Sequence, residues 1–461
     1  ILLRAIVFPP NRRYRGKTMQ VKTDLRPASR QSSTDSKGIA GIRHVLEKPD
    51  SCSKCGLCLN ACPVYRIFLT ESASPRGKVQ LSRRILEGTL DLSDHMKEIL
   101  SRCLLCGSCS AACPSGVQGA HLFSGMRWMA TRKLGLDWRK KTLYRILARK
   151  WMLSASARFA AWATRYFGPL IERGAPERLP LAGVPAFNDR PFSETSRPVT
   201  PAAGPLRARV LYFHGCATNY LYDQIGNAVL SVLSRMGVEV ITPKDQGCCG
   251  IPIILSGARE TALSSIRSVL DTFSRRDIDA VIVDCATCGS ALRREYVPLL
   301  SEMKAEGQDV DDDTIDTAVF LATHTFDVME FIADHIDWLP ELAGTRDRAT
   351  FTYHDPCHLI KGQGVGPQLR RIFRSLPNAD FMEMPEADTC CGGGGVFQID
   401  HPDISAAITA RKIDNIRRTG ADTLATGCPG CRMTIGAHLG RESDIRIVHP
   451  IQLVEAALRE I

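Results

Sequence analysis

Cys52-Ser-Lys-Cys-Gly-Leu-Cys-Leu-Asn-Ala-Cys-Pro63 is the stretch that decides how the first part of this chain folds. Its spacing, Cys-x2-Cys-x2-Cys-x3-Cys-Pro, returns between Cys103 and Pro114. Three cysteines at this spacing can surround one 4Fe-4S cluster, while the fourth, before the proline, ligates a neighbouring cluster. The two runs together therefore predict two 4Fe-4S clusters that exchange their fourth ligands.

This exchange gives an expected ligand set for each cluster. The first set is Cys52, Cys55, Cys58 and Cys113, and the second set is Cys103, Cys106, Cys109 and Cys62. A pair of zinc ribbons would also use paired cysteines, but zinc leaves the third cysteine of each run and the Cys-Pro ending without a role. We therefore favour iron over zinc at these positions.

The sequence around the two runs has helical periodicity. Apolar residues recur three or four positions apart in the segments 79–86, 96–100, 122–129 and 143–162. Because helical sequence rather than hairpins joins the runs, we expect an α-helical ferredoxin domain.

The second half of the chain contains an internal repeat. Residues 209–216 and 350–357 are short β-like runs that each end in a cysteine, and a Cys-Cys-Gly run follows each of them, at 248–250 and 390–392. Strand signals at 238–241, 280–283, 381–384 and 423–425 alternate with helix signals at 220–236, 259–275 and 404–418. This alternation predicts two tandem α/β domains, each built on a parallel sheet.

Each repeat carries five cysteines at or just beyond the expected strand ends. The first repeat has Cys216, Cys248, Cys249, Cys285 and Cys288, and the second has Cys357, Cys390, Cys391, Cys428 and Cys431. Ligands bind at the carboxyl ends of parallel strands, so the five thiols of one repeat can converge on one point. Five thiols exceed the four that tetrahedral zinc or a simple cubane takes, which favours an unusual iron-sulfur cluster. The alternative that one repeat holds zinc, or no metal, stays open.

These patterns predict an α + α/β fold in five parts. We expect a disordered or basic N-terminal arm at 1–48, the α-helical ferredoxin domain with basic helices at 49–173, and a proline-rich linker at 174–205. The first and second cysteine-rich (CCG) domains follow at 206–340 and 341–461.

Composition limits where the protein works and what it binds. The chain has 461 residues, 18 cysteines and a net charge of +10. Cysteines clustered at CxxC spacing indicate metal rather than disulfides, and hence a reducing, cytoplasmic compartment. No apolar run approaches the roughly 20 residues that span a bilayer, so we expect attachment to the inner face of a membrane only through partners. The basic stretch 127–173 favours acidic partners or an anionic surface, and we expect its helices mainly to cover the core with a solvated face. No nucleic-acid partner is expected, because no recognisable binding module is present.

The motifs also resemble a known family. The resemblance rests on the runs Cys-Ser-Lys-Cys-Gly-Leu-Cys58, Ala-Cys-Pro-Val-Tyr65, Pro75-Arg-Gly77 and Cys113-Pro-Ser-Gly116, and on both Cys-Cys-Gly repeats. From about residue 49 to residue 461, the chain resembles the glycolate oxidase iron-sulfur subunits, within the wider group of proteins similar to the D subunit of heterodisulfide reductase.

The resemblance implies an electron-transfer role in a glycolate or D-lactate oxidoreductase. It implies an FAD-binding hydroxy-acid dehydrogenase subunit as the electron donor, and a quinone or a membrane-associated carrier as the acceptor. The complete set of ten cysteines in the repeats leans towards the alternative, a heterodisulfide reductase-like enzyme with a non-cubane cluster that acts on disulfides.

Substrate oxidation itself is not expected on this chain. No Gly-x-Gly-x-x-Gly follows a strand, so we assign no catalytic residue and no flavin or nicotinamide site. His354, Asp355 and His358 flank Cys357 and can either relay protons and hydrogen-bond a cluster sulfur or serve the fold alone. The basic helices of the first domain would attract an acidic acceptor or an anionic membrane. We therefore expect electrons to enter through the repeats and to leave through the clusters at 52–113.

Overall fold

The computed structural model describes residues 49–174, 186–343, 349–440 and 443–458, and in residues 167–174 it describes the backbone alone. The predictions for the arm at 1–48, and for residues 175–185 of the linker, lie outside the described residues. The described ranges all belong to one unit, Gly38–Ile461, within which contacts join the helical block to both repeats.

The first block is helical throughout its described residues, 49–174. Its elements are η2 (Pro49–Ser51), α2 (Leu57–Ala61), α3 (Tyr65–Phe68), η3 (Glu71–Ala73), α4 (Pro75–Leu86), α5 (Asp94–Ser101), α6 (Ser108–Ala111), α7 (Gly119–Leu134), α8 (Trp138–Ala148) and α9 (Lys150–Gly174). The four predicted helical segments are confirmed, except that the last is two helices. Arg149 is extended, with φ −110° and ψ 108°, and separates α8 from α9.

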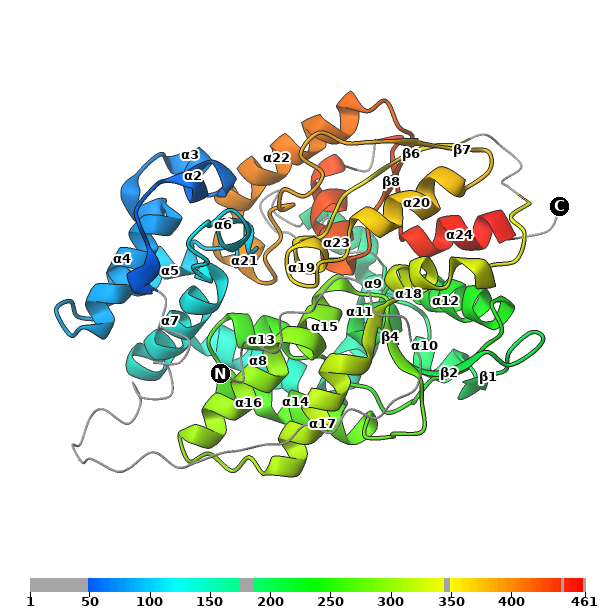
Figure 1. Ribbon diagram of the computed structural model, residues 1–461, viewed down its shortest axis with the longest axis horizontal. Coiled ribbons are helices and arrows are strands. Elements are labelled where there is room, and N and C mark those ends of the chain that lie inside the picture. The colour runs from blue at the N-terminus through cyan, green and yellow to red at the C-terminus, as the bar shows by residue number, and fades with distance from the viewer. Residues whose placement is uncertain (1–48, 175–185, 344–348, 441–442, 459–461) are drawn as a thin grey trace. The chain divides into compact units, whose positions relative to one another are not determined.

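The first repeat is a parallel sheet with helices between its strands (Figure 1). Its strands are β2 (Ala208–Phe213), β3 (Val238–Ile241), β4 (Ala280–Val283) and β5 (Thr325–Asp327). Its helices are α11 (Gly215–Tyr220), α12 (Asp223–Arg235), α13 (Ile251–Leu255), α14 (Arg259–Thr272), α15 (Ala286–Ser290), the π-helical turn η5 (Ala291–Glu295), α16 (Tyr296–Ala305), α17 (Asp312–His324), α18 (Val328–Asp334) and η6 (Ile336–Trp338).

The second repeat has the same topology. Its elements are β6 (Ala349–Tyr353), α19 (Cys357–Ile360), α20 (Pro367–Ser375), β7 (Ala379–Met382), α21 (Phe397–Asp400), α22 (Pro402–Arg418), β8 (Thr423–Ala425), α23 (Pro429–Leu439), β9 (Arg446–Val448) and α24 (Pro450–Leu458). The strand order β7-β6-β8-β9 matches β3-β2-β4-β5 of the first repeat, and all these pairs are parallel. The internal repeat and the α/β class are therefore confirmed, although β7 begins two residues before the predicted strand.

Part of the expected linker belongs to the first sheet. Within 186–205, the chain forms α10 (Phe192–Thr195) and β1 (Val199–Thr200), and β1 pairs antiparallel with β3. Phe192 is fully buried, and a Cβ added at Gly226 would lie 2.6 Å from its ring. This close fit explains why a stretch rich in proline, with little periodicity, is nevertheless ordered at its end.

The first sheet is buried on both faces of its strand β2. In β2, Val210 and Tyr212 enter a core that continues into the second repeat, whereas Leu211 and Phe213 enter a core shared with α8. Successive side chains of a strand point to opposite faces, so a strand covered on both sides reads as continuously apolar. The carboxyl ends of the strands remain available to hold other groups.

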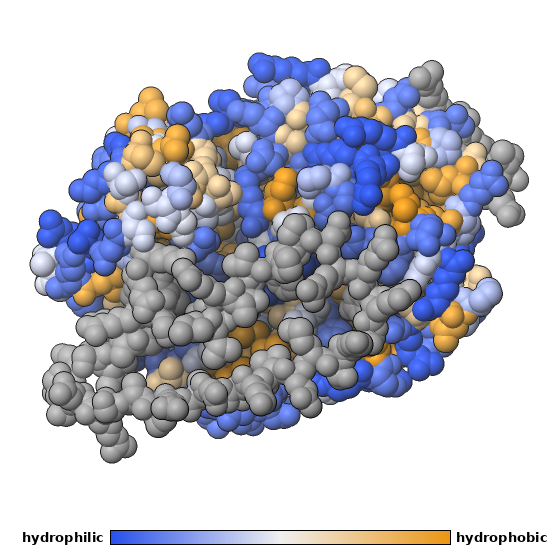
Figure 2. Space-filling view, viewed as in Figure 1, coloured by the Kyte–Doolittle hydropathy of each residue, from blue (hydrophilic) through white to orange (hydrophobic). Residues whose placement is uncertain are grey.

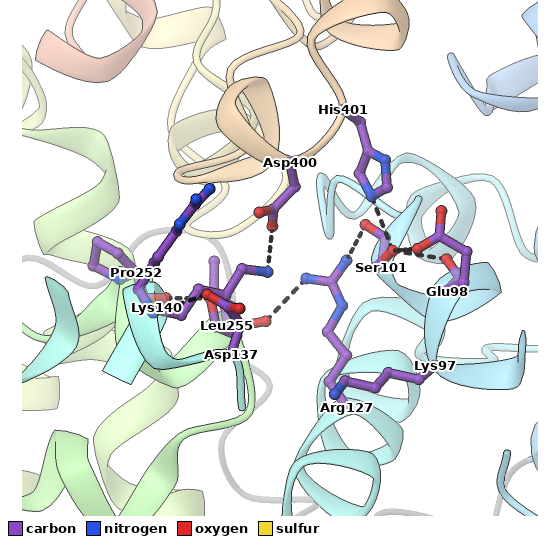
Figure 3. Close-up of polar contacts among 12 residues, drawn as sticks. Lys97, Glu98, Ser101, Arg127, Asp137, Lys140, Pro252, Leu255, Asp400 and His401 are labelled. Atoms are coloured by element: carbon purple, nitrogen blue, oxygen red, sulfur yellow. Dashed lines mark hydrogen bonds and ion pairs between the residues drawn. The ribbon is translucent and has the colours of Figure 1, made fainter. Parts of the chain in front are cut away.

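The helical block is bonded to both repeats (Figure 3). The Arg127 guanidinium donates to the carbonyl oxygen of Leu255 at the end of α13. On the second repeat, Ser101 Oγ lies 2.9 Å from Nε2 of His401, and Lys140 Nζ lies 2.7 Å from a carboxylate oxygen of Asp400. These contacts fix the cysteine runs of the block against the cysteine-bearing ends of the sheets.

The surface of the basic helices differs from the expected solvated face because several of its aromatic side chains are exposed. Figure 2 shows hydrophilic residues over much of the described surface in that view, with separate apolar patches. Trp128 is buried, but Trp138 on α8 and Trp151, Phe159 and Tyr166 on α9 are exposed. None of the described helices is long and apolar enough to cross a membrane.

Candidate iron-sulfur sites

The two cysteine runs of the helical block share one backbone conformation. Lys54 and Gly56 in the first run, and Leu105 and Gly107 at the matching places of the second, all have positive φ, between 52° and 86°. Each glycine precedes a short helix, α2 or α6, that carries the third cysteine of its run. These left-handed residues curve each run so that its thiols can face a common point.

The fourth cysteine of each run lies with the other run. Cys62 interacts electrostatically with Cys103 and Cys106, and Cys58 interacts with Cys113. One cavity is lined by the four thiol-bearing residues of the second expected set, Cys62, Cys103, Cys106 and Cys109, together with Lys78. Of the first expected set, Cys52, Cys58 and Cys113 are part-buried and Cys55 is exposed. The structure therefore gathers the second expected set around one cavity and places Cys58 near Cys52 and Cys113, while the complete first set stays a prediction.

The five thiols of the first repeat converge at the carboxyl ends of three strands. Cys216 lies in α11 after β2, the adjacent pair 248–249 follows β3, and the third pair, at 285 and 288, flanks the start of α15 after β4. The thiols form a continuous series of neighbours, which runs Cys216, Cys248, Cys249, Cys288 and Cys285. Four of the five residues are buried.

The second repeat places its five thiols in the same way. Cys357 begins α19 after β6, the adjacent pair 390–391 follows β7, and the third pair, at 428 and 431, flanks the start of α23 after β8. The series runs Cys357, Cys390, Cys391, Cys431 and Cys428. The ligand atoms of His354, Cys391 and Cys431 all lie within 4.8 Å of one another.

The groups also touch one another across domain boundaries. Cys106 of the helical block packs against the same apolar cluster as Cys390 of the second repeat, and Cys390 raises the pKa of the Cys106 thiol. Cys428 of the second repeat interacts directly with Cys285 of the first, where the backbone N–H of Ala286 donates to the oxygen of Gly427 at 3.0 Å. The cysteines of the helical block, of the second repeat and of the first repeat are therefore contiguous.

The donor chemistry fits iron-sulfur clusters. Burial raises the pKa of Cys62 to about 12 and raises the pKa of Cys109 well above its ordinary value. Thiols with such pKa values lose their protons readily only when a metal ion binds the sulfur in place of the proton. Soft thiolates gathered around a small cavity are the ligand set that iron-sulfur clusters require.

Two protein-family models match this arrangement. A 4Fe-4S dicluster domain matches residues 48–117, and a cysteine-rich (CCG) domain matches residues 210–293 and 351–436. The chain is 29% identical to the probable glycolate oxidase iron-sulfur subunit of Bacillus subtilis, over 88% of this chain and 94% of that one. It is 27% identical to the glycolate oxidase iron-sulfur subunit of Escherichia coli, over 89% of this chain and 94% of that one. The chain is 25% identical to the D subunit of a heterodisulfide reductase of Methanosarcina acetivorans, over 94% of this chain and 98% of that one.

The chain is therefore similar, over most of its length, to glycolate oxidase iron-sulfur subunits and to a heterodisulfide reductase D subunit. It combines a dicluster domain with two CCG domains, as the cysteine spacing predicted. Among solved structures, a hypothetical protein from Helicobacter pylori matches with a TM-score of 0.45 and 10% identity, covering 93% of this chain and 77% of that chain.

Three polar residues beside the second CCG site have different surroundings. His354 is buried, Nδ1 lies 3.2 Å from the oxygen of Ala387, and Nε2 has no hydrogen-bond partner among the described residues. Asp355 accepts two hydrogen bonds of 2.6 Å from Arg370, which is a structural ion pair. Nδ1 of His358 lies 3.2 Å from the hydroxyl of Thr287.

Sequence reasoning missed two residues that contact the sites. Thr287 Oγ1 lies 3.3 Å from the sulfur of Cys428, although the two residues belong to different CCG domains. Its only signal was its place inside the pair Cys285-Ala-Thr-Cys288. Lys78, which lines the cavity, directly follows the run Pro75-Arg-Gly77. Nothing in the sequence around Lys78 indicates that it faces a cavity.

Proposed function

We propose that this chain is the iron-sulfur electron-transfer subunit of a flavin-dependent 2-hydroxy-acid oxidoreductase. The two expected ligand sets of the dicluster domain, and the five cysteines of each CCG domain, hold the clusters. When bound, these clusters carry electrons one at a time. An FAD-binding glycolate or D-lactate dehydrogenase subunit donates the electrons, and a quinone or other membrane-associated carrier receives them.

The continuity of the cysteine groups is the observation that carries this proposal. Cys106 meets Cys390, and Cys428 meets Cys285, so the buried groups form one series through the protein. Electron transfer needs such a series, because its rate falls steeply with the distance between redox groups. Relatives described as glycolate oxidase iron-sulfur subunits and as a lactate utilization protein A support the substrate class.

Reduction by the substrate tests the proposal. The protein is isolated anaerobically from its source together with its partners, iron is measured, and glycolate or D-lactate is added while cluster absorption is followed. We expect a flavoprotein to co-purify and the clusters to bleach. Cys55→Ser should lower the iron content, whereas Ser53→Ala, an exposed neighbour in the same run, should not. Iron-replete protein that neither substrate reduces in the presence of the co-purified proteins would exclude the proposal.

The direction of electron flow forms part of the same proposal, with entry through the CCG domains and exit through the dicluster domain. Replacing Cys106 by Ser should remove the second dicluster site and stop transfer to the acceptor, while the CCG sites remain reducible by the donor. If that variant loses donor-driven reduction of CCG sites that still contain their iron, the direction is the reverse.

A second candidate function is disulfide reduction at a CCG site. It is favoured by the retention of all ten CCG cysteines, and by the 25% identity to the D subunit of heterodisulfide reductase. A thiolate attacks a disulfide sulfur, forms a mixed disulfide and displaces the other sulfur as a thiolate. Two electrons supplied through the clusters, when bound, would then cleave the mixed disulfide into two thiolates, so thiols beside a redox group suit this chemistry. Reduced, iron-replete protein that turns over none of a panel of small disulfides would exclude it.

A further inference from the structure

Lys78 is a buried cation that faces the second dicluster site, the group formed by Cys62, Cys103, Cys106 and Cys109. Its side chain is about 2% exposed and lines the same cavity as the four thiols. Its Nζ donates a single hydrogen bond, 2.5 Å long, to the oxygen of Ala73. Among the described residues, no carboxylate forms a salt bridge with it. A buried ammonium without a counter-ion is costly unless an anionic group lies nearby.

The start of α4 holds Lys78 in this position. Ser74 caps the helix by accepting a 2.8 Å hydrogen bond from the N–H of Gly77. A Cβ at residue 77 would lie 2.0 Å from the oxygen of Glu71, so only glycine allows the helix to begin this close to η3. The neighbouring residue, Lys78, is therefore directed to the cavity by packed backbone rather than by a flexible loop.

A second, part-buried cation, Arg127, contacts the backbone of the same group. Arg127 donates to the carbonyl oxygens of Ser101 and Leu255 (Figure 3). It also donates to the carbonyl oxygens of Leu100 and Cys103. Its four partners are all neutral, and no salt bridge to it occurs in the described part of the chain.

The first dicluster site has different surroundings. Its Cys55 is exposed to solvent. The nearby Arg76 forms two hydrogen bonds, 2.9 and 3.1 Å long, to the carboxylate of Glu71, and about a third of its side chain is exposed. Solvent and a paired carboxylate screen a positive charge, whereas burial preserves its effect.

We infer that Lys78 is a positioning residue that raises the reduction potential of the second dicluster site above that of the first. A site that gains one electron gains one negative charge, and a buried cation stabilises the reduced form more than the oxidised form. The second site, whose Cys106 lies beside Cys390 of the second CCG domain, then retains electrons in transit. The inference rests on the proposed function, because it presupposes iron-sulfur clusters at these cysteines.

Potentiometric EPR on the full-length, anaerobically purified protein tests this inference. Cys55→Ser and Cys106→Ser identify the signals of the first and second sites. In Lys78→Met, we expect the ratio of oxidised to reduced second site to rise at least tenfold at a fixed potential, which is about 59 mV for a one-electron couple. The first site should be unchanged, and Lys78→Arg should lie near the wild type.

Lys97→Met is the matched control. Lys97 belongs to the same helical block, and its Nζ also donates to a single carbonyl oxygen, that of Gly135 at 2.7 Å, but it does not line the cavity. An unchanged second-site potential in iron-replete Lys78→Met, or an equal fall in Lys97→Met, would overturn the inference.

Loss of the second-site signal is also informative. Loss in Lys78→Met but not in Lys78→Arg would support a need for the positive charge, whereas loss in both would indicate a need for the lysine's shape and overturn the inference. If the second-site potential shifts as expected but no 2-hydroxy acid reduces the clusters, only the proposed function would be excluded. A preparation with zinc and no iron would remove both.

Discussion

Asp327 offers a quantitative test of the electrostatics inside the first CCG domain. It ends β5, is about 1% exposed, and caps α18 by accepting a 2.9 Å hydrogen bond from the N–H of Met329. Its other carboxylate oxygen, Oδ2, has no hydrogen-bond partner among the described residues. Burial raises the pKa of this carboxyl from 3.8 to about 7.

The raised pKa makes the folded protein lose stability as the pH rises. Between pH 3.8 and about pH 7, the folded state holds a proton on Asp327 that the unfolded state has released. The free energy of unfolding therefore falls across this window as pH increases. At about 1.4 kcal/mol per unit of pKa, the loss between pH 5 and pH 8 is about 3 kcal/mol.

Asp327→Asn should remove this dependence. Asparagine is neutral at every pH and caps a helix about as well as aspartate. We expect the variant to gain about 3 kcal/mol relative to the wild type between pH 5 and pH 8, measured from urea unfolding midpoints at both pH values. Asp311→Asn is the control, because Asp311 also caps a helix but is exposed and its pKa is lowered. A difference between Asp327→Asn and wild type that does not change with pH would refute the reasoning.

Three further substitutions test how the domains are packed. Arg127→Met removes a charged donor from four carbonyl oxygens and should lower the free energy of unfolding by about 3–5 kcal/mol. Arg132→Gln, which alters a half-exposed side chain, is the control. An effect of Arg127→Met no larger than that of the control would contradict the prediction. Phe273→Ala empties a fully buried position beside Phe213 and should cost about 3–5 kcal/mol in urea unfolding, so a cost below about 1 kcal/mol would show that the site collapses. Gly394→Val places a branched side chain at φ 49°, where a Cβ would lie 2.7 Å from Leu104. The variant should lose about 1–3 kcal/mol in free energy of unfolding and should release iron. Normal iron content and stability would show that this contact between domains is dispensable.

Local patterns predicted most of the fold. The apolar periodicity of α4, α5 and α7, and the alternation of strand and helix in both repeats, depend on neighbouring residues alone, so they can be recognised without tertiary structure. The errors lie where distant contacts decide. Arg149 interrupts a pattern that is continuous in sequence, and β1 joins the first sheet from a stretch that local propensity marks as linker.

The sequence by itself determined which cysteines belong to the dicluster domain and which to the two CCG domains. The spacing of the 18 cysteines specifies groups of thiols, because a short loop can only place nearby residues around a common point. The internal repeat in turn predicted that each CCG domain would gather its five cysteines at the ends of parallel strands.

Only the tertiary structure decided how these groups relate to one another. The contact of Cys106 with Cys390, and of Cys285 with Cys428, joins residues that are far apart in the chain. Lys78 faces the second dicluster site because α4 packs closely against η3, and this packing leaves no mark in the sequence around the lysine. Such contacts depend on how whole domains pack, and the free energy of that packing is spread over many residues rather than encoded in a short motif.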